Sequence, residues 1–134
     1  MNIISYGSFD LLHKGHLNVI NKMRKIVGEE GKVIIGLSTK KFNKIKSKTN
    51  SESYKIRKKH LLNNDVDLVI AEKNWNQKLT DITKYKIDYF LMGSDWFGIF
   101  DELIEKVMVI SVPRTKGINS SMLRNKLFDD KNEN

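Results

Sequence analysis

The sequence predicts an α/β protein with a parallel β-sheet and helices on both faces. Short runs rich in β-branched residues alternate along the chain with stretches whose apolar residues recur at helical spacing. This alternation is typical of a sheet in which each helix connects two parallel strands. With 134 residues, the chain is long enough for one domain with a core of its own.

The first half of the chain is expected to contribute two strands and two helices. Residues 2–6 form a short run of β-formers, and from Leu17 to residue 27 apolar residues recur every three or four positions. Residues 32–38 form a second, largely apolar run. A polar but helix-like stretch covers residues 52–62, and the basic residues 39–48 before it are expected to form an exposed loop.

The second half of the chain continues the alternation. Strands are expected at residues 67–70, 88–92 and 107–111, and helices at residues 77–85 and 119–128. The domain would therefore span residues 1–128, and the polar residues 129–134 are expected to form a frayed tail.

The charge balance favours anionic ligands. The chain has 24 Lys and Arg residues against 16 Asp and Glu, a net charge of +8, so phosphates or nucleic acid would be attracted. A solvated lysine-rich surface would account for most of these charges as well. The chain has no cysteine, no leader-like start and no apolar run of membrane-spanning length, so we expect a cytoplasmic protein without a membrane partner.

Residues 6–16 lie at the turn between the first strand and the first helix. Gly7 lets the backbone turn, and Gly15 leaves phosphate oxygens free access to the amides that open the helix. His13 and His16 are three residues apart, so their rings would share one helix face and could donate two hydrogen bonds to one phosphate. A lone histidine here would more often be a cap. Two at this spacing around a glycine favour a nucleoside triphosphate site.

These residues resemble a known signature. Gly7 to Asp10, followed by His13-Lys14-Gly15-His16, resembles the HxGH motif of the nucleotidyltransferase superfamily, and Leu11 in place of proline resembles its cytidylyltransferase branch. The resemblance implies a Rossmann-like three-layer fold with a five-stranded parallel sheet in the order 3-2-1-4-5. Ligands of such sheets bind beyond the carboxyl ends of the strands.

Later segments extend the resemblance over most of the chain. Residues 114–121 resemble a second family signature, RTxGIST(T/S), in which a guanidinium, a glycine and helix-capping hydroxyl groups suit the β- and γ-phosphates. An ordinary capped helix is the alternative interpretation. Residues 72–78 (EKNWNQK) and 92–101 look specifically like bacterial glycerol-3-phosphate cytidylyltransferases.

The resemblance, with the residue chemistry, implies a set of site residues. Those expected to act in catalysis are His13, His16, Lys14, Lys46 and Arg114. Substrate contacts are expected from Gly7, Ser8, Phe9, Lys46, Lys48, Arg57, Trp75, Gly93, Asp95, Trp96, Arg114, Thr115, Gly117, Ile118, Asn119, Ser120 and Ser121. Trp75 would otherwise pack on the core, Asn76 would cap the next helix, and Asp95 would cap a turn.

The implied reaction is cytidylyl transfer. CTP and a phosphorylated alcohol, most simply sn-glycerol 3-phosphate, would give the CDP-alcohol and pyrophosphate for a cell-surface polymer such as teichoic acid or a capsule. Mg²⁺ would enter with CTP, since the chain shows no separate metal-binding cluster. Relatives are dimers, so a homodimer is expected.

Some residues depart from the family pattern. Residues 63–67 lack an arginine that relatives use for substrate binding, and Ser94 and Asn119 replace the usual Asp and Ser. Another acceptor, such as a pentitol phosphate or phosphoethanolamine, therefore stays open. A non-catalytic nucleic-acid binder is a further alternative, but the basic stretch 40–48 has only Phe42 for base stacking.

Overall fold

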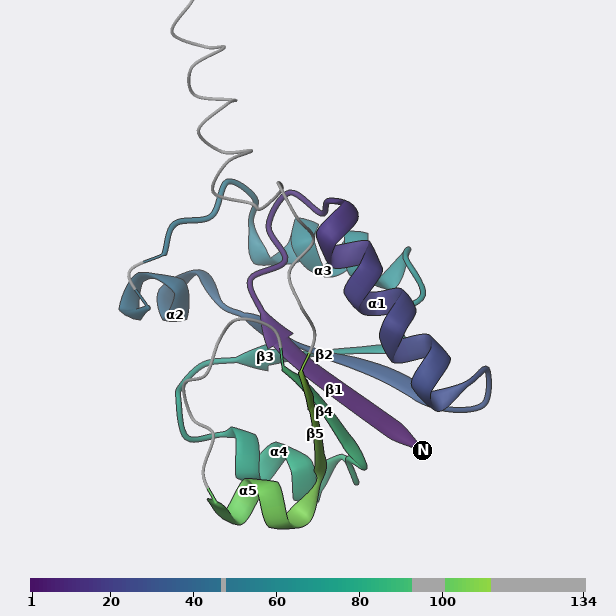
Figure 1. Cartoon of the computed structure of the whole chain (residues 1–134). Coiled ribbons are helices and arrows are strands. Elements are labelled where there is room, and N and C mark those ends of the chain that lie inside the picture. Colours follow the sequence, from purple (N-terminus) through teal and green to yellow (C-terminus); the bar gives the residue numbers. More distant parts are fainter. Residues whose placement is uncertain (47, 93–100, 112–134) are drawn as a thin grey trace, which may run out of the picture.

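The computed structural model describes residues 1–46, 48–92 and 101–111, and it has a five-stranded parallel sheet at its centre (Figure 1). The strands are β1 (Asn2–Gly7), β2 (Lys32–Ser38), β3 (Leu68–Glu72), β4 (Tyr89–Met92) and β5 (Met108–Ser111). Their order is β3-β2-β1-β4-β5, and every neighbouring pair is parallel. The predicted fold class and strand order are confirmed.

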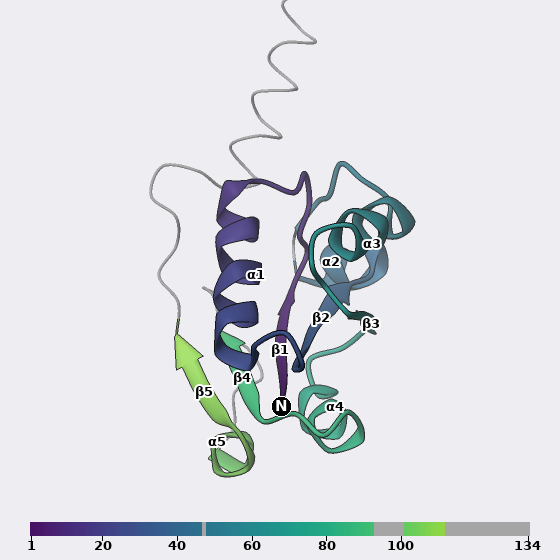
Figure 2. The same ribbon diagram turned by 90° about the vertical axis from the view of Figure 1, so that its right-hand side faces the viewer.

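Helices cover both faces of this sheet (Figures 1 and 2). The helices are α1 (Lys14–Val27), α2 (Lys40–Ile45), α3 (Tyr54–Leu62), α4 (Lys78–Lys84) and α5 (Asp101–Lys106). Helices α1 and α3 pack on one face, where Ile20, Met23 and Leu61 join one buried apolar cluster. Helices α4 and α5 pack on the other, where Ile82 and Leu103 join a second cluster.

The strands supply both clusters because successive side chains point to opposite faces. Ile3 faces the α1 side and Ile4 the α4 side, and Val33 and Ile34 divide in the same way. All four side chains are at most 1% exposed. The sheet is thus buried on both faces, as parallel sheets generally are.

The structure corrects several local predictions. Residues 40–45 form helix α2 rather than a loop, because the Thr39 hydroxyl caps the helix at 3.1 Å from the Phe42 amide and the Phe42 ring is buried. Helix α5 was not predicted. Asn76 does not cap α4; the N-cap is Gln77, while the Asn76 amide donates to the Asn74 side chain.

Other outcomes concern the ends of elements. Leu17 belongs to the predicted apolar repeat of α1, yet it is 37% exposed, because the helix buries Ile20 and Met23 instead. The predicted helix at residues 119–128 and the tail at 129–134 lie outside the described residues. Within the part of the chain that the structure describes, no helix is long and apolar enough to cross a bilayer.

Candidate active site at the carboxyl edge of the sheet

The two histidines of the first signature lie at the start of α1, just beyond the carboxyl end of β1. The rings of His13 and His16 are stacked, with centroids 3.7 Å apart and planes 19° from parallel. His13 is the N-cap, and its Nδ1 accepts a hydrogen bond from the Gly15 amide at 3.0 Å. The His16 Nδ1 accepts from the His13 amide at 3.3 Å. Each imidazole therefore satisfies an amide at the helix start, and the predicted pairing of the rings is confirmed.

These bonds determine where the protons lie. A neutral imidazole whose Nδ1 accepts a hydrogen bond carries its proton on Nε2. Burial lowers the pKa of His13, and burial together with the neighbouring His13 lowers the pKa of His16 to about 3. Both rings are therefore neutral at physiological pH, and each has one Nε2–H donor left for a ligand.

A second segment clasps the turn that carries these histidines. Phe9 and Leu11 adopt positive φ values of 45° and 51°, which are unfavourable for residues other than glycine. The fully buried Asp10 carboxylate accepts from the Ser51 and Glu52 amides at 2.8 and 3.1 Å. In return, the Glu52 carboxylate accepts from the Leu11 amide at 2.8 Å. We call this reciprocal set of bonds the Asp10–Glu52 clasp.

Arg57 ties the same turn to the neighbouring strand. Its Nη1 donates to the carbonyl oxygens of Ser8 at 2.9 Å and Ser38 at 2.8 Å, and its Nε donates to that of Glu52 at 3.2 Å. The side chain is fully buried, and burial lowers its pKa. Within the described residues, its Nη2 has no hydrogen-bond partner. Arg57 therefore holds the turn, the end of β2 and the segment before α3 together through their backbone carbonyl oxygens.

A cluster of buried charges lies at the carboxyl ends of β2 and β3. Glu72 is 1% exposed; its Oε1 lies 3.4 Å from the Lys46 ammonium, and its Oε2 lies 3.2 Å from that of Lys78. The Ser38 hydroxyl donates to the same Oε1 at 2.8 Å and accepts from Lys46 at 2.7 Å. We call Ser38, Lys46, Glu72 and Lys78 the lysine cluster.

Tyr6 connects this cluster to β1. The Lys78 ammonium lies 4.8 Å from the centre of the Tyr6 ring, and the Tyr6 hydroxyl donates to Asp81 at 2.9 Å. Burial and the nearby Asp81 carboxylate raise the pKa of Tyr6, which therefore remains a neutral donor. Gln77 also donates to Asp81, at 2.8 Å, and holds the start of α4 against β3.

The structure brings other predicted residues near these groups. Phe9 is buried with its ring 5.1 Å from that of His16, and a side chain at Gly7 would meet it at 3.1 Å. The Ser8 hydroxyl donates to Asn43 at 2.8 Å, so it holds α2 against the turn. Trp75 packs edge-on against Phe42, with ring centres 5.0 Å apart.

Not every predicted residue joins this group. Lys14 and Lys48 are exposed, and the Lys48 amide donates to the Asn43 carbonyl oxygen at 2.8 Å. Ten predicted residues lie outside the described part of the chain, so their place stays a prediction: Gly93, Asp95, Trp96, Arg114, Thr115, Gly117, Ile118, Asn119, Ser120 and Ser121.

Sequence reasoning gave no role to several residues of the site. Ser38 was predicted only as the end of a strand, and Glu72 and Lys78 only as members of the EKNWNQK segment. Asn43 and Glu52 were given no role. The signal that could have found Ser38 and Glu72 is their position: each is a polar residue that ends an apolar parallel strand, where ligands of such sheets bind.

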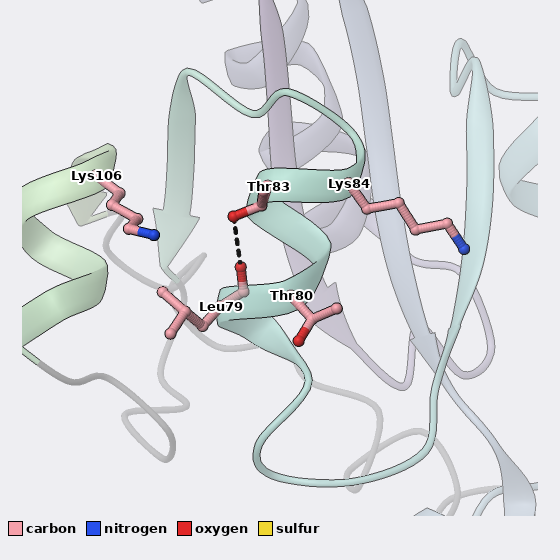
Figure 3. Close-up of a pocket in the computed structure, with 5 residues that line it drawn as sticks. All are labelled: Leu79, Thr80, Thr83, Lys84 and Lys106. Carbon is pink, nitrogen blue, oxygen red and sulfur yellow. Dashed lines mark hydrogen bonds between the residues drawn. The ribbon is translucent and has the colours of Figure 1, made fainter.

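A surface hollow of about 530 Å³ lies elsewhere, between α4 and α5 (Figure 3). Its walls come from Leu79, Thr80, Thr83, Lys84 and Lys106, and the Thr83 hydroxyl within it donates to the Leu79 carbonyl oxygen at 3.3 Å. None of these residues was predicted for the site. The hollow shares no residue with the histidine pair, the Asp10–Glu52 clasp or the lysine cluster.

Comparison with known proteins gives relatives over nearly the full length of the chain. A glycerol-3-phosphate cytidylyltransferase from Staphylococcus aureus is 42% identical over 127 residues, covering 94% of both chains. Proteins of the same name from Bacillus spizizenii and Bacillus subtilis are 45% and 40% identical and cover 91% and 93% of this chain, and 93% and 95% of their own.

Structural comparison agrees on the fold. A crystal structure of a lipopolysaccharide core biosynthesis protein from Thermoplasma volcanium has a TM-score of 0.66 at 19% identity, covering 88% of this chain and 98% of its own. The family model for cytidylyltransferase-like proteins matches residues 4–129, a range that contains the histidine pair, the Asp10–Glu52 clasp and the lysine cluster. This extent of similarity, together with the HxGH turn, makes the chain a member of the cytidylyltransferase-like family.

Proposed function

We propose that this enzyme transfers CMP from CTP to sn-glycerol 3-phosphate, giving CDP-glycerol and pyrophosphate. The observation that carries the proposal is the pair of neutral, stacked imidazoles with Nε2–H donors at the carboxyl edge of the sheet. The names of the three relatives, which are 40–45% identical to this chain, support the choice of both substrates.

The chemistry needs no nucleophile from the protein. An oxygen of the acceptor phosphate would attack the α-phosphorus of CTP, and the bond from that phosphorus to the bridging oxygen would break. Pyrophosphate would leave with the electron pair of that bond. The main task is therefore to bring two anions together and to stabilise the charge that builds on the phosphate oxygens.

The neutral histidines suit this task. The Nε2–H groups of His13 and His16 would donate to oxygens around the α-phosphate, and the start of α1 adds the positive end of a helix dipole. Lys14, Lys46 and Arg114 would offset negative charge. Because the imidazoles need not be protonated, they can act throughout the neutral pH range.

We propose that Mg²⁺ enters as a complex with CTP. Two carboxylates at the carboxyl edge of the sheet are already engaged: that of Asp10 by two amides and that of Glu72 by two lysines. Within residues 1–46, 48–92 and 101–111, no three acidic or histidine side chains are grouped to hold a metal ion. Phosphate oxygens are therefore the natural ligands, and the ion would lower the charge of the triphosphate.

A second phosphorylated alcohol has to be considered as the acceptor. The family resemblance implies an arginine near residue 64, where this chain has Asn64. The Asn64 side chain donates to the His60 carbonyl oxygen at 2.7 Å, at the end of α3. A different phosphorylated alcohol, such as a pentitol phosphate, is therefore the second candidate.

We also propose a homodimer in the cytoplasm that supplies a glycerol phosphate polymer of the cell surface. The lack of cysteine suits a reducing compartment, and the net charge of +8 attracts both anionic substrates.

The test is a panel of four nucleotides against three acceptors, measured as pyrophosphate release with Mg²⁺ and with the product identified by mass. We expect release with CTP and glycerol 3-phosphate, and its loss in the His13→Ala, His16→Ala double variant. Lys84→Ala on the exposed side of α4 serves as the matched control and should retain activity. Full turnover by the double variant, or no release with any pair, would overturn the proposal.

A further inference from the structure

We infer that Glu72 is a positioning residue that holds the Lys46 ammonium at the carboxyl edge of the sheet. The inference rests on the proposed function, in which Lys46 contacts phosphate oxygens of the substrates. Glu72 carries the same sign of charge as the phosphates, so its carboxylate would not bind their oxygens directly. Its effect on the reaction would therefore pass through Lys46.

The backbone places Glu72 and Ser38 side by side. They are Cα partners at the last step of the β2–β3 ladder, so both side chains start from the same fixed edge. Lys46 arrives from the end of α2 and Lys78 from the first turn of α4. The carboxylate thus joins four separate segments, none of which would hold the lysine by itself.

The hydrogen bonds give the Lys46 ammonium a defined position. It donates to the Ser38 hydroxyl at 2.7 Å, and that hydroxyl donates to the Glu72 Oε1 at 2.8 Å, while the direct ammonium–carboxylate distance is 3.4 Å. Lys78 binds the other oxygen, Oε2, so the carboxylate is held at both ends. The Phe42 ring, 4.9 Å from the ammonium, bounds it on a further side.

The Glu72 carboxylate allows two lysines to be kept in a largely buried place. Burying a lysine ammonium costs free energy unless an anion lies beside it. Here the single Glu72 carboxylate serves both Lys46 and Lys78. The lysine cluster therefore holds both lysines in fixed positions at the edge of the sheet where phosphate is expected to bind.

The first test measures placement without any assay of activity. Lysines of the folded protein are acetylated at low reagent concentration and followed one by one by mass spectrometry. In the wild type, we expect Lys46 and Lys78 to react much more slowly than the exposed Lys44 and Lys48. In Glu72→Gln, Lys46 should react about tenfold faster, because its ammonium loses the charge-assisted contact that holds it away from the reagent.

Two further variants control for a general disturbance. Asp81→Asn alters a carboxylate of the same region that contacts Tyr6 and Gln77, and it should leave the Lys46 rate unchanged. Ser38→Ala removes only the bridging hydroxyl, so it should free Lys46 and leave Lys78 protected; it also serves if Glu72→Gln does not fold. A Lys46 that reacts as fast as Lys44 in the wild type would overturn the inference.

The second test asks whether Glu72 acts through Lys46. We expect Glu72→Gln to lower kcat/KM by about 10²-fold, as a misplaced binding group does. The Glu72→Gln, Lys46→Met double variant should be no worse than Lys46→Met alone, within about twofold. Losses that multiply, or a Glu72→Gln enzyme with full activity, would contradict the positioning role. If the wild type released no pyrophosphate, the proposed function would fail, and the acetylation rates alone would decide the placement of Lys46.

Discussion

The histidine pair and the lysine cluster lie at the same edge of the sheet but are built in opposite ways. The histidine pair is local: its bonds join residues at most three apart, and its rings are neutral. The lysine cluster is assembled from residues 38, 46, 72 and 78, and it depends on full charges.

This difference indicates that the histidine pair tolerates changes elsewhere in the fold better than the lysine cluster does. The capping bonds of His13 and His16 form whenever α1 forms, because they belong to its first turn. The lysine cluster forms only when β2, β3, α2 and α4 have all docked. We therefore expect variants that loosen the fold to affect the lysine cluster before the histidine pair.

The largest effect is expected for the histidines themselves. His16→Ala should lower kcat by about 10²–10³-fold, the usual cost of losing one donor to a developing oxyanion. His16→Asn keeps a donor of shorter reach and should recover part of this loss. Steady-state pyrophosphate release measures both variants, and equal kcat in His16→Ala and the wild type would remove His16 from the chemistry.

A change in the sheet should disturb the lysine cluster selectively. A Cβ at Gly36 would lie 2.2 Å from the Tyr6 ring, the ring that lies beneath Lys78. Gly36→Ala should therefore cost about 1–3 kcal/mol in the free energy of unfolding, as overpacking does. Urea unfolding measures that cost, and faster acetylation of Lys78 would report the displaced ring. An unchanged unfolding midpoint would contradict the close packing.

The Asp10–Glu52 clasp should contribute to stability to a comparable extent. Glu52→Ala leaves the Leu11 amide without its acceptor, which should cost about 1–3 kcal/mol because the segment is partly buried. The Leu11 φ of 51° should then relax, so we expect kcat to fall as well. Glu52→Gln, which retains an acceptor oxygen, is the matched control; a Glu52→Ala enzyme with wild-type stability would argue against the clasp.

The last effect concerns pH. The pKa of His16 falls from 6.5 to about 3 on folding, so between these values the unfolded chain binds more protons than the folded one. The stability gained by keeping His16 neutral is fully present above pH 6.5 and is lost as the pH falls toward 3. Urea midpoints of the wild type should drop over this window more than those of His16→Gln. Parallel curves for the two proteins would contradict the assigned burial.

The sequence predicted the architecture because alternating periodicity and buried strands leave few arrangements open. The order of the strands and the helices α1, α3 and α4 agree with prediction to within two or three residues at most ends. Helix α2 was missed because its Lys-rich sequence resembles a solvated loop, whereas the Thr39 cap and the burial of Phe42 favour a helix.

In the site, too, local features could be predicted from the sequence and long-range contacts could not. His13 and His16 could be paired from their spacing, since a helix turn alone brings them together. That Lys46 turns inward could not be predicted, because its anionic partner, Glu72, lies 26 residues away in the sequence and meets it only through the β2–β3 pairing. The state of the Asp95 and Arg114 segments stays a prediction, since both lie outside the described residues.

The most direct test of the central claim is the protonation state of the two imidazoles, measured by nitrogen-15 NMR of the histidine rings between pH 5 and 8. We predict that His13 and His16 are neutral at pH 7 with the proton on Nε2, and that His16 stays neutral at pH 5. A charged His16 at pH 6, or protons on Nδ1, would contradict the account of two neutral donors aimed at phosphate.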